Sequence, residues 1–489
     1  ALLPAPPSPT PTPEATPTPT AMPTPSGTPT VTPTPTPSAS PTATPTPTSL
    51  DVTSYGARGD GVTDDTNAIL AAIRAARGQP VYFPSGTYKL ASTLSVPNAA
   101  HLAGPSDAGP ASTAWLKGAV VYGSSQTFTD LRIGDRGKTG IVNGSGASGT
   151  TFTRCQFRGG SGGNYRAAAV FGGGLNSCDH ITFTDCNFER NLADHPVDRD
   201  TSDTVGCNTV IWIERVDRVD GAHMEYITFN GCHFGVSNGR TDIARSIGSP
   251  RMTMEMYQYH EGGAVRDGWH HITFTGCIFE AGDCSTLDAP SATYNNQHTD
   301  AYLTIDGCVF HGGGVTRDYW QGGVNLEGIN YVTIHDNDFY PARQYTMSIA
   351  DHGPPSHDVR ITGNRFHLDD YSHGGISTHN TEPQIWLEGN NGTFSDNVVR
   401  NSTGGQWLLW LGWFYDGQRA DGWTITGNTF RELRATPQHM VTVHDATNCT
   451  ITGNTFQTAA PSFPRGTPVA CSGVNTGTTI SNNNVVLSK

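Results

Sequence analysis

The sequence predicts an all-β solenoid that is preceded by an extended arm, and three observations carry this prediction. A short pattern of an apolar residue, Thr, a turn, a small residue and an apolar residue recurs a dozen times along the chain. Only one segment, near residue 70, has apolar residues at helical spacing. The first 48 residues are mostly Thr-Pro alternation. A strand-and-turn repeat of about 30 residues is typical of solenoids, in which each repeat stacks on the one before it.

Residues 1–48 are predicted to form an extended arm or stalk. They carry one charged residue, Glu14, and little apolar surface, so polyproline II is their expected state. At about 3.1 Å per residue the arm could reach on the order of 150 Å. Its Thr residues are candidates for O-glycosylation. The chain also starts at Ala1 without Met, which suggests a processed product, and we therefore expect a secreted or cell-surface protein.

Residues 49–100 are predicted to form a cap of strand, helix and strand. Ile69, Leu70 and Ile73 lie at helical spacing, and the helix is expected to end at Gly78. Acids and Thr before the helix suit its N-cap and first turn. The cap residues singled out are Asp60, Asp64, Asp65 and Thr66. The segment 80–89 then predicts a strand, a turn and a second strand.

The run Tyr55-Gly-Ala-x-Gly-Asp-Gly-x-Thr-Asp-Asp-Thr66, with Val81-x-Phe-Pro-x-Gly-x-Tyr88 after the helix, resembles the entry motif of pectate-lyase-like proteins. The resemblance implies a right-handed parallel β-helix in which this motif is a structural cap. The superfamily includes polysaccharide lyases, glycoside hydrolases and phage tailspikes, so the motif implies the fold rather than one chemistry. No motif requires a cofactor, although the acid-rich run leaves Ca²⁺ binding open as an alternative.

Residues 101–489 are predicted to form the β-helix itself, with about twelve coils. The small residue of the repeat is Cys in the first block of coils and Asn in the second, which predicts an internal ladder of buried side chains. The ladder residues are Cys155, Cys186, Cys232, Cys277, Cys308, Asn337, Asn364, Asn397, Asn428, Asn454 and Asn483. A metal-binding Cys array is excluded because no C-x-x-C occurs. Disulfides among the other cysteines remain open.

A second strand can be aligned in six of the repeats, it ends in a carboxylate in five of these six, and it carries the candidate active site. Counting along these strands predicts that acids on successive coils form one row, about 4.8 Å apart. Carboxyl groups at such separations serve as the acid and base of glycosidases. The alternative is a structural role, in which these acids cap turns or bind structural calcium. The predicted catalytic residues are Glu214, Glu255, Asp288 and Glu327, and the predicted carbohydrate contacts are Trp212, Tyr257, Tyr259 and Trp320.

Charge and hydropathy exclude some classes of function. The net charge is −14, which argues against nucleic-acid binding because a phosphate backbone requires a basic face. The longest apolar runs, such as Trp407–Trp413, are far shorter than the roughly 20 residues that span a membrane.

Three functions stay open at this stage. The first is a structural subunit that assembles into a surface fibre or filament with copies of itself through the Thr-Pro arm. The second is a secreted polysaccharide hydrolase or lyase on a stalk. The Gly-His-Gly and Arg-Ile-Lys motifs that a polygalacturonase would show are missing, which favours the structural reading. The third is a non-catalytic carbohydrate-binding protein that uses aromatic residues such as Trp407, Trp410 and Trp413, which core or intersubunit packing would also explain. Glycans are thus possible partners in two of the three.

Overall fold

The computed structural model describes residues 49–487 apart from loop segments between strands. The segments that lie outside the description are 107–112, 136–139, 160–168, 172–176, 191–208, 217–223, 236–251, 260–268, 281–284, 291–298, 313–321, 343–344, 351–354, 371–382, 402–406, 413–419, 433–439 and 460–466. In β15, β19 and most of β22 only the backbone is described. The arm predicted for residues 1–48 therefore lies outside the described residues.

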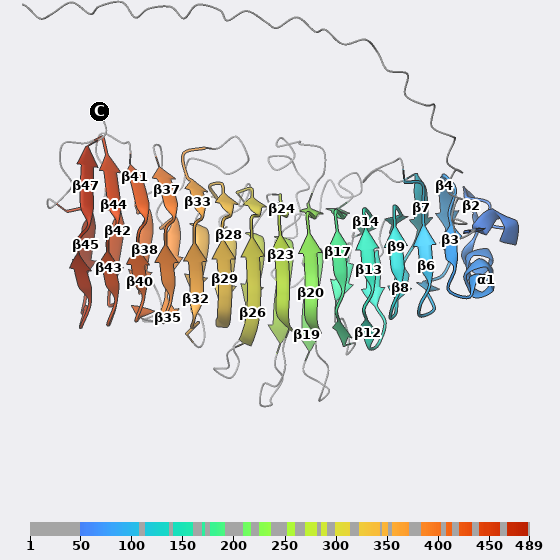
Figure 1. Cartoon of the computed structure of the whole chain (residues 1–489), viewed down its shortest axis with the longest axis horizontal. Helices are drawn as coiled ribbons and strands as arrows, with labels where there is room; N and C mark the ends of the chain where they lie inside the picture. Colours follow the sequence, from blue (N-terminus) through green and yellow to red (C-terminus); the bar gives the residue numbers. More distant parts are fainter. Residues whose placement is uncertain are drawn as a thin grey trace, which may run out of the picture. The chain divides into compact units, whose positions relative to one another are not determined.

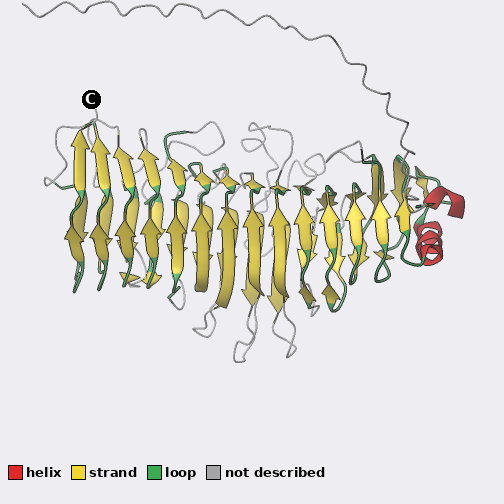
Figure 2. Cartoon of the chain, viewed as in Figure 1, coloured by secondary structure: helices red, strands yellow, loops and turns green. Residues whose placement is uncertain are grey.

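The described chain is a right-handed parallel β-helix built from three long sheets (Figures 1 and 2). Each coil contributes a strand to sheet A, then one to sheet B, then one to sheet C, and every pairing between coils is parallel. Successive coils lie side by side along the long axis, so the colours of Figure 1 run in order from blue to red. Because each strand in the middle of a sheet lies between strands of the coils before and after it, the backbone N–H and C=O groups along both of its edges are hydrogen-bonded.

The strands of the three sheets have the following bounds. Sheet A contains β1 (Leu50–Asp51), β3 (Pro80–Tyr82), β6 (His101–Ala103), β9 (Thr127–Thr129), β12 (Ala147–Ser148), β13 (Thr151–Thr153), β16 (Cys178–Asp179), β17 (Thr182–Thr184), β20 (Met224–Asn230), β23 (Trp269–Thr275), β26 (Thr299–Asp306), β29 (Ile329–His335), β32 (Val359–Thr362), β36 (Thr393–Ser395), β40 (Thr424–Thr426), β43 (Thr450–Thr452) and β46 (Thr479–Ser481). Sheet B contains β2 (Asp60–Asp64), β4 (Gly86–Lys89), β7 (Ala114–Lys117), β10 (Arg132–Ile133), β14 (Gln156–Gly159), β18 (Asn187–Arg190), β21 (His233–Phe234), β24 (Ile278–Phe279), β27 (Val309–Phe310), β30 (Asp338–Phe339), β33 (Arg365–His367), β37 (Val398–Asn401), β41 (Thr429–Glu432), β44 (Thr455–Thr458) and β47 (Asn484–Leu487). Sheet C contains β5 (Leu94–Ser95), β8 (Val120–Tyr122), β11 (Ile141–Asn143), β15 (Ala169–Phe171), β19 (Thr209–Val216), β22 (Met252–Tyr259), β25 (Ser285–Pro290), β28 (Gly322–Glu327), β31 (Tyr345–Ala350), β34 (Ile385–Leu387), β38 (Leu409–Gly412), β42 (Val441–His444) and β45 (Val469–Ser472). A short separate pair joins β35 (Gly389–Asn390) and β39 (Ala420–Asp421).

A single α-helix among the described residues, α1 (Thr66–Ala76), lies at the start of the solenoid beside β2, β3 and β4 (Figure 1). It follows the 3-10 helix η1 (Val52–Tyr55) and buries Ile69, Ala72, Ile73 and Ala76 on one face. The helix ends one residue earlier than expected, because Arg77 adopts a left-handed conformation (φ 47°) before Gly78. Residues 49–100, predicted as a cap, already stack as coils, since β1 pairs with β3 and β3 with β6.

The cap acids fix the backbone around the start of α1. Both carboxylate oxygens of Asp65, which is fully buried, accept hydrogen bonds from the backbone N–H groups of Arg58 and Gly59 (2.7 and 3.1 Å). Asp64 Oδ1 accepts from the N–H and hydroxyl of Thr66 (3.1 and 2.6 Å). Backbone N–H groups of Thr63 and Val62 lower the pKa of Asp60 to about 2. The carboxylates thus hold the loop that leads into the helix.

The core is made of stacked columns of identical or similar side chains. Phe128, Phe152, Phe183, Phe229 and Phe274 stack face to face inside sheet A with ring centroids 4.7–5.0 Å apart. A second Phe column runs inside sheet B from Phe157 to Phe366. Because each ring contacts its neighbours on both faces, every coil buries its apolar surface against the next. None of the described helices is long and apolar enough to cross a membrane.

The small residues of the repeat lie in the turn between sheets A and B and point into the core. The five predicted Cys residues are at most 1% exposed, and the Asn residues from Asn337 to Asn454 are fully buried. Asn364 Oδ1 accepts from both the N–H and the Nδ2 of Asn337 (3.0 and 2.9 Å), and the same pair of bonds recurs down to Asn483. At the junction of the blocks, Cys308 N–H donates to Asn337 Oδ1 (2.7 Å).

Cysteines among the described residues are all present as free thiols. Seven are buried and Cys471 is exposed, while Cys207 and Cys284 lie outside the description. Burial raises the pKa of the Cys178 thiol to about 12, so it stays protonated at neutral pH. Cys178 therefore acts as a small packing group.

Candidate functional site

The predicted acids lie on sheet C, but they do not form the single row that was predicted. Glu255 pairs in register with Asp288, whereas Glu214 pairs with Tyr257 and Glu327 pairs with Pro290. The four acids are therefore divided between two columns that are two residues apart. The prediction aligned the strands by their terminal carboxylate, and this register is wrong for β19 and β28. Side chains of Glu214 and Glu255 lie outside the described residues.

Asp288 and Glu327 come together through the side chain of Asn325. Asn325 Nδ2 donates to Asp288 Oδ1 (3.0 Å) and to Glu327 Oε1 (2.8 Å). Two oxygens that contact one nitrogen at these distances lie within about 6 Å of each other. The alternating residues Leu287 and Leu326 are buried in the core, so the three polar side chains lie on the outer face of sheet C. We call these three residues the carboxylate pair and its bridging amide.

This arrangement has the elements of a general acid–base site. Two carboxyl groups can divide the roles of acid and of base or nucleophile. Carboxyl separations of about 5–5.5 Å belong to retaining glycosidases, and separations of about 6.5–9.5 Å belong to inverting ones. Because Asn325 is 9% exposed and contacts both groups, it fixes their relative position. The sequence singled out both acids but missed Asn325, which occupies the same register column as Asp288.

The predicted carbohydrate contacts are placed only in part. Trp212 pairs in register with Glu255, and Tyr257 with Glu214, so both aromatics share the two columns of the acids. Tyr259 follows at the end of β22. Their side chains, and the whole of Trp320, lie outside the described residues. Farther along sheet C, Trp407 and Trp410 pack edge to face at 5.1 Å.

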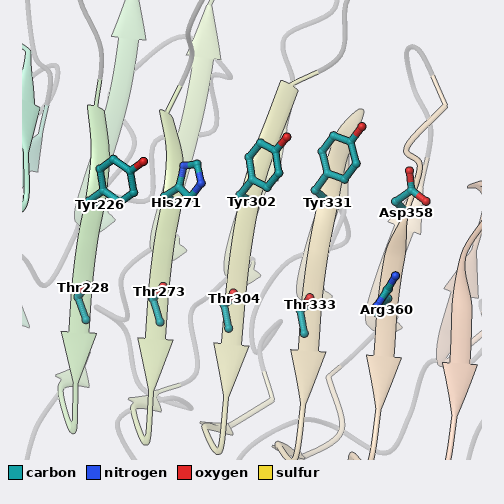
Figure 3. Close-up of a pocket in the computed structure, with 10 residues that line it drawn as sticks. All are labelled: Tyr226, Thr228, His271, Thr273, Tyr302, Thr304, Tyr331, Thr333, Asp358 and Arg360. Carbon is teal, nitrogen blue, oxygen red and sulfur yellow. The ribbon is translucent and has the colours of Figure 1, made fainter.

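A shallow groove of about 520 Å³ lies on the outer face of sheet A, where the sequence had predicted no site (Figure 3). An aromatic or imidazole ring and a Thr side chain line it from each of four successive strands, and the next strand adds an acid and an arginine (Figure 3). The lining residues are Tyr226, Thr228, His271, Thr273, Tyr302, Thr304, Tyr331, Thr333, Asp358 and Arg360. We call this feature the aromatic groove.

The rings of the aromatic groove form a continuous stack along the solenoid axis. Tyr226, His271, Tyr302 and Tyr331 lie 4.7–4.8 Å apart between ring centroids, with interplanar angles of 7–26°. The faces of the inner rings are covered by their neighbours, so their edges and polar atoms are presented to solvent. Asp300 raises the pKa of Tyr331, which keeps its hydroxyl protonated and able to donate a hydrogen bond.

All four ring-bearing residues have a backbone that such side chains rarely adopt. Their φ angles are +55°, +56°, +45° and +57° for Tyr226, His271, Tyr302 and Tyr331. Left-handed backbone at bulky residues is costly and concentrates at functional sites. The sequence held a signal for the groove, since Tyr or His precedes the Thr of the repeat by two residues on five successive coils, beginning with His180 on the coil before the groove.

A third polar cluster lies on the outer face of sheet B, around Glu280. Its two carboxylate oxygens contact His233 Nε2 (2.8 Å) and His311 Nδ1 (2.7 Å). Burial raises the pKa of Glu280, but the hydrogen bonds with His233 and then His311 outweigh it and bring the pKa down to about 2. This carboxylate is therefore ionised across the physiological range and serves as an anchor between coils.

One group of the described side chains has the composition of a metal site. Asp306, His335 and Asp336, at the end of β26 and β29, place one ligand atom each within 4.8 Å of one another. They lie on the same face of sheet A as the aromatic groove, since Thr304 and Thr333 precede Asp306 and His335 by two residues.

Comparisons with known families agree with the fold. Residues 49–287 match the family model described as rhamnogalacturonase A/epimerase, pectate lyase-like, and residues 222–412 match the model described as right-handed beta helix region. The chain therefore belongs to the pectate-lyase-like superfamily of right-handed parallel β-helix proteins, as its entry motif predicted.

Similar proteins share only a limited part of the chain. The non-secreted LysM effector LysM19 of Penicillium expansum is 36% identical over 99 residues, which is 19% of this chain and 7% of that protein. A glucan 1,3-beta-glucosidase of Cochliobolus carbonum is 33% identical over 96 residues, 18% of this chain and 11% of that protein. Among solved structures, the Dettilon tailspike protein superposes with a TM-score of 0.51 at 14% identity, covering 87% of this chain and 68% of that one. The chain thus spans a small fraction of these sequence relatives, and the tailspike supports the fold alone.

Proposed function

We propose that this protein is an extracellular polysaccharide-active β-helix protein whose reaction is carried by Asp288 and Glu327. The observation behind the proposal is the Asn325 amide that holds one oxygen of each carboxylate (3.0 and 2.8 Å) on the outer face of sheet C. The matched names of a rhamnogalacturonase/epimerase family and a glucan glucosidase support a glycan as substrate class.

In this proposal one carboxyl group protonates the glycosidic oxygen as its bond to the anomeric carbon breaks, and the other carboxylate bonds to that carbon. Water, deprotonated by the first carboxylate, then displaces the second and releases the sugar. Their separation of at most about 6 Å favours the retaining course, because an inverting enzyme needs room for a water molecule between carboxylate and sugar. Asn325 then acts as a positioning residue, and Trp212 and Tyr257, which share the two register columns of the acids, are the proposed contacts for the sugar chain.

The experiment is an activity screen of the full chain on a panel that includes rhamnogalacturonan, other pectic polymers and β-1,3-glucan. Glu327→Gln and Asp288→Asn should each lower the rate by at least about 100-fold, since each removes an acid, base or nucleophile. The matched control is Asp396→Asn, an exposed acid in a sheet A turn, whose activity should equal that of the parent protein. Product anomers followed by NMR would report retention.

Several outcomes would contradict the proposal. Cleavage that survives both substitutions would place the reaction elsewhere, and an absence of cleavage on every glycan would remove the enzymatic function. Binding to a glycan without cleavage would instead support the non-catalytic alternative.

Assembly into a filament through residues 1–48 remains a separate prediction. Those residues lie outside the described part of the chain. Deletion of residues 1–48 should abolish any fibre seen by electron microscopy if the arm mediates assembly, whereas fibres formed by the truncated protein would refute it.

A further inference from the structure

Asp306, His335 and Asp336 form a compact group of three potential ligands. His335 Nδ1 lies 3.1 Å from Asp306 Oδ1 and 3.5 Å from Asp336 Oδ2. Two ligand atoms bound to one ion at about 2.1 Å and separated by angles of about 90–109° lie about 3.0–3.4 Å apart. The 3.1 Å spacing falls within this range and the 3.5 Å spacing lies just above it, so a small side-chain movement would let all three groups share one metal ion.

Asp306 and His335 differ in residue type from the other members of their register column in sheet A. Asp306 pairs directly with His335 on the next coil. Every other described position in this outward-facing column from β9 onward is Thr, Ser or Asn, namely Thr129, Thr153, Thr184, Asn230, Thr275, Thr362, Ser395, Thr426, Thr452 and Ser481. Small polar residues suit an outer β surface, and ionisable ligands replace them on two adjacent coils only.

We propose that Asp306, His335 and Asp336 bind a divalent transition-metal ion of the Zn²⁺ type. One imidazole nitrogen and two carboxylate oxygens form a donor set that such ions accept, and the two carboxylates neutralise the ionic charge. The imidazole distinguishes the site from a calcium site, which takes oxygen ligands. This inference concerns sheet A and does not depend on the reaction proposed for sheet C.

The backbone around the three residues is held in place by the neighbouring coils. Asp306 C=O accepts from Gly276 N–H (2.8 Å), and His335 C=O accepts from Gly307 N–H (3.1 Å). Asp336 reaches the group because its left-handed backbone (φ 57°) turns the chain directly after β29. A site built on stacked strands needs little rearrangement to bind an ion.

The exposure of the three residues leaves room for additional ligands. The side chains of Asp306, His335 and Asp336 are 35%, 34% and 70% exposed. Three protein ligands would therefore leave coordination positions for water or for oxygen atoms of a molecule in the aromatic groove, whose Thr304 and Thr333 lie on the same strands. The ion would then add a cationic contact to this groove on an acidic protein.

The alternative is that these residues form an ordinary exposed His–Asp ion pair, which contributes little to the stability of the fold and binds no metal. Isothermal titration of the chelator-treated full chain with ZnCl₂ separates the two readings. We expect a component of one Zn²⁺ per chain whose affinity falls by at least about tenfold in His335→Ala and in Asp306→Asn. Affinity should also fall as the pH is lowered, because bound ligands must be deprotonated.

The matched control is His357→Ala. His357 lies on the same face of the solenoid and its Nδ1 contacts Asp358 Oδ2 at 2.9 Å, so it offers a His–Asp pair outside the proposed ligand set. Its variant should keep the one-equivalent component unchanged. A second readout is thermal unfolding, where Zn²⁺ should raise the Tm of the parent and of His357→Ala but not of His335→Ala.

Three results would overturn the proposal. These are no Zn²⁺ binding by the parent, Zn²⁺ binding that is equal in the parent and in both ligand variants, and saturation by CaCl₂ with no binding of ZnCl₂.

Discussion

Asn397 illustrates how a single side chain joins three coils. Its Oδ1 accepts from the N–H and Nδ2 of Asn364 (2.9 and 3.0 Å), and its Nδ2 donates to Ile361 C=O on that same coil (2.9 Å) and to Asn428 Oδ1 on the next coil (3.0 Å). Asn397→Ala should lower the free energy of unfolding by about 2–4 kcal/mol, because two buried donors of Asn364 lose their acceptor. Urea unfolding measures this loss. The exposed Asn484→Ala is the control, with a change within about 0.5 kcal/mol; equal losses in both variants would contradict the ladder's role.

Glu280 makes stability depend on pH. Its folded pKa of about 2 lies below the ordinary value of 4.5, so its stabilising effect is complete above about pH 4.5 and is lost as the pH falls toward 2. Glu280→Gln should therefore lower the free energy of unfolding at pH 7 by on the order of 2–3 kcal/mol, and by much less at pH 2. Unfolding in urea between pH 2 and 7 tests this.

The control for Glu280 is Glu225→Gln, which removes an acid 3.6 Å from His270 on sheet A. It should change stability by no more than about 1 kcal/mol at either pH. If the free energies of unfolding of the parent and of Glu280→Gln differ by the same amount at every pH from 2 to 7, the two His contacts do not depress the pKa of the Glu280 carboxyl group.

At the level of strands, the aromatic groove combines ring stacking with backbone strain. Tyr302→Ala should destabilise the protein because Ala keeps the left-handed strain and loses the stack with His271 and Tyr331. Tyr302→Gly should be more stable than Tyr302→Ala by about 1 kcal/mol, since Gly tolerates positive φ. Thermal unfolding of the pair measures the strain directly. If the Ala variant is as stable as the Gly variant, the backbone at position 302 is not strained.

The turn between sheets A and B could be predicted from sequence because its conformation is encoded locally. The residue before each ladder position has positive φ, and it is usually Gly or Asp, as at Gly307 and Asp336. A two-residue turn of constant length then fixes the register of the strands on both sides. The Thr and Phe columns of these sheets follow from that register.

Sheet C could not be aligned in the same way. Its strands are bounded by loops of different length, so no short turn sets which residues pair, and Glu214 falls opposite Tyr257 rather than Glu255. The contact of the Asn325 amide with both acids could not be predicted, because it depends on the pairing of Asn325 with Asp288. The aromatic groove was missed for another reason, since Tyr and His at positive φ contradict ordinary backbone preferences.

At the level of the whole molecule, α1 closes the first coil of the solenoid. Ile69→Asp would place a charge in a fully buried position, and we expect a loss of at least about 2 kcal/mol together with undocking of the helix. The uncovered sheet ends should then associate, which light scattering would detect. Ala71→Asp, on the exposed side of the same helix, should leave the protein monodisperse. If both variants associate, the association is not caused by the loss of the helical cap.

The unbroken amide column from Asn337 to Asn483 has a consequence for the growth of such proteins. Each layer presents the same acceptor to the layer before it and the same donors to the layer after it, so any two layers of this stretch are interchangeable partners. A tandem copy of residues 428–453 would meet complementary surfaces above and below. The C-terminal half is thus a modular rod whose length can change by whole turns without redesign of its interior.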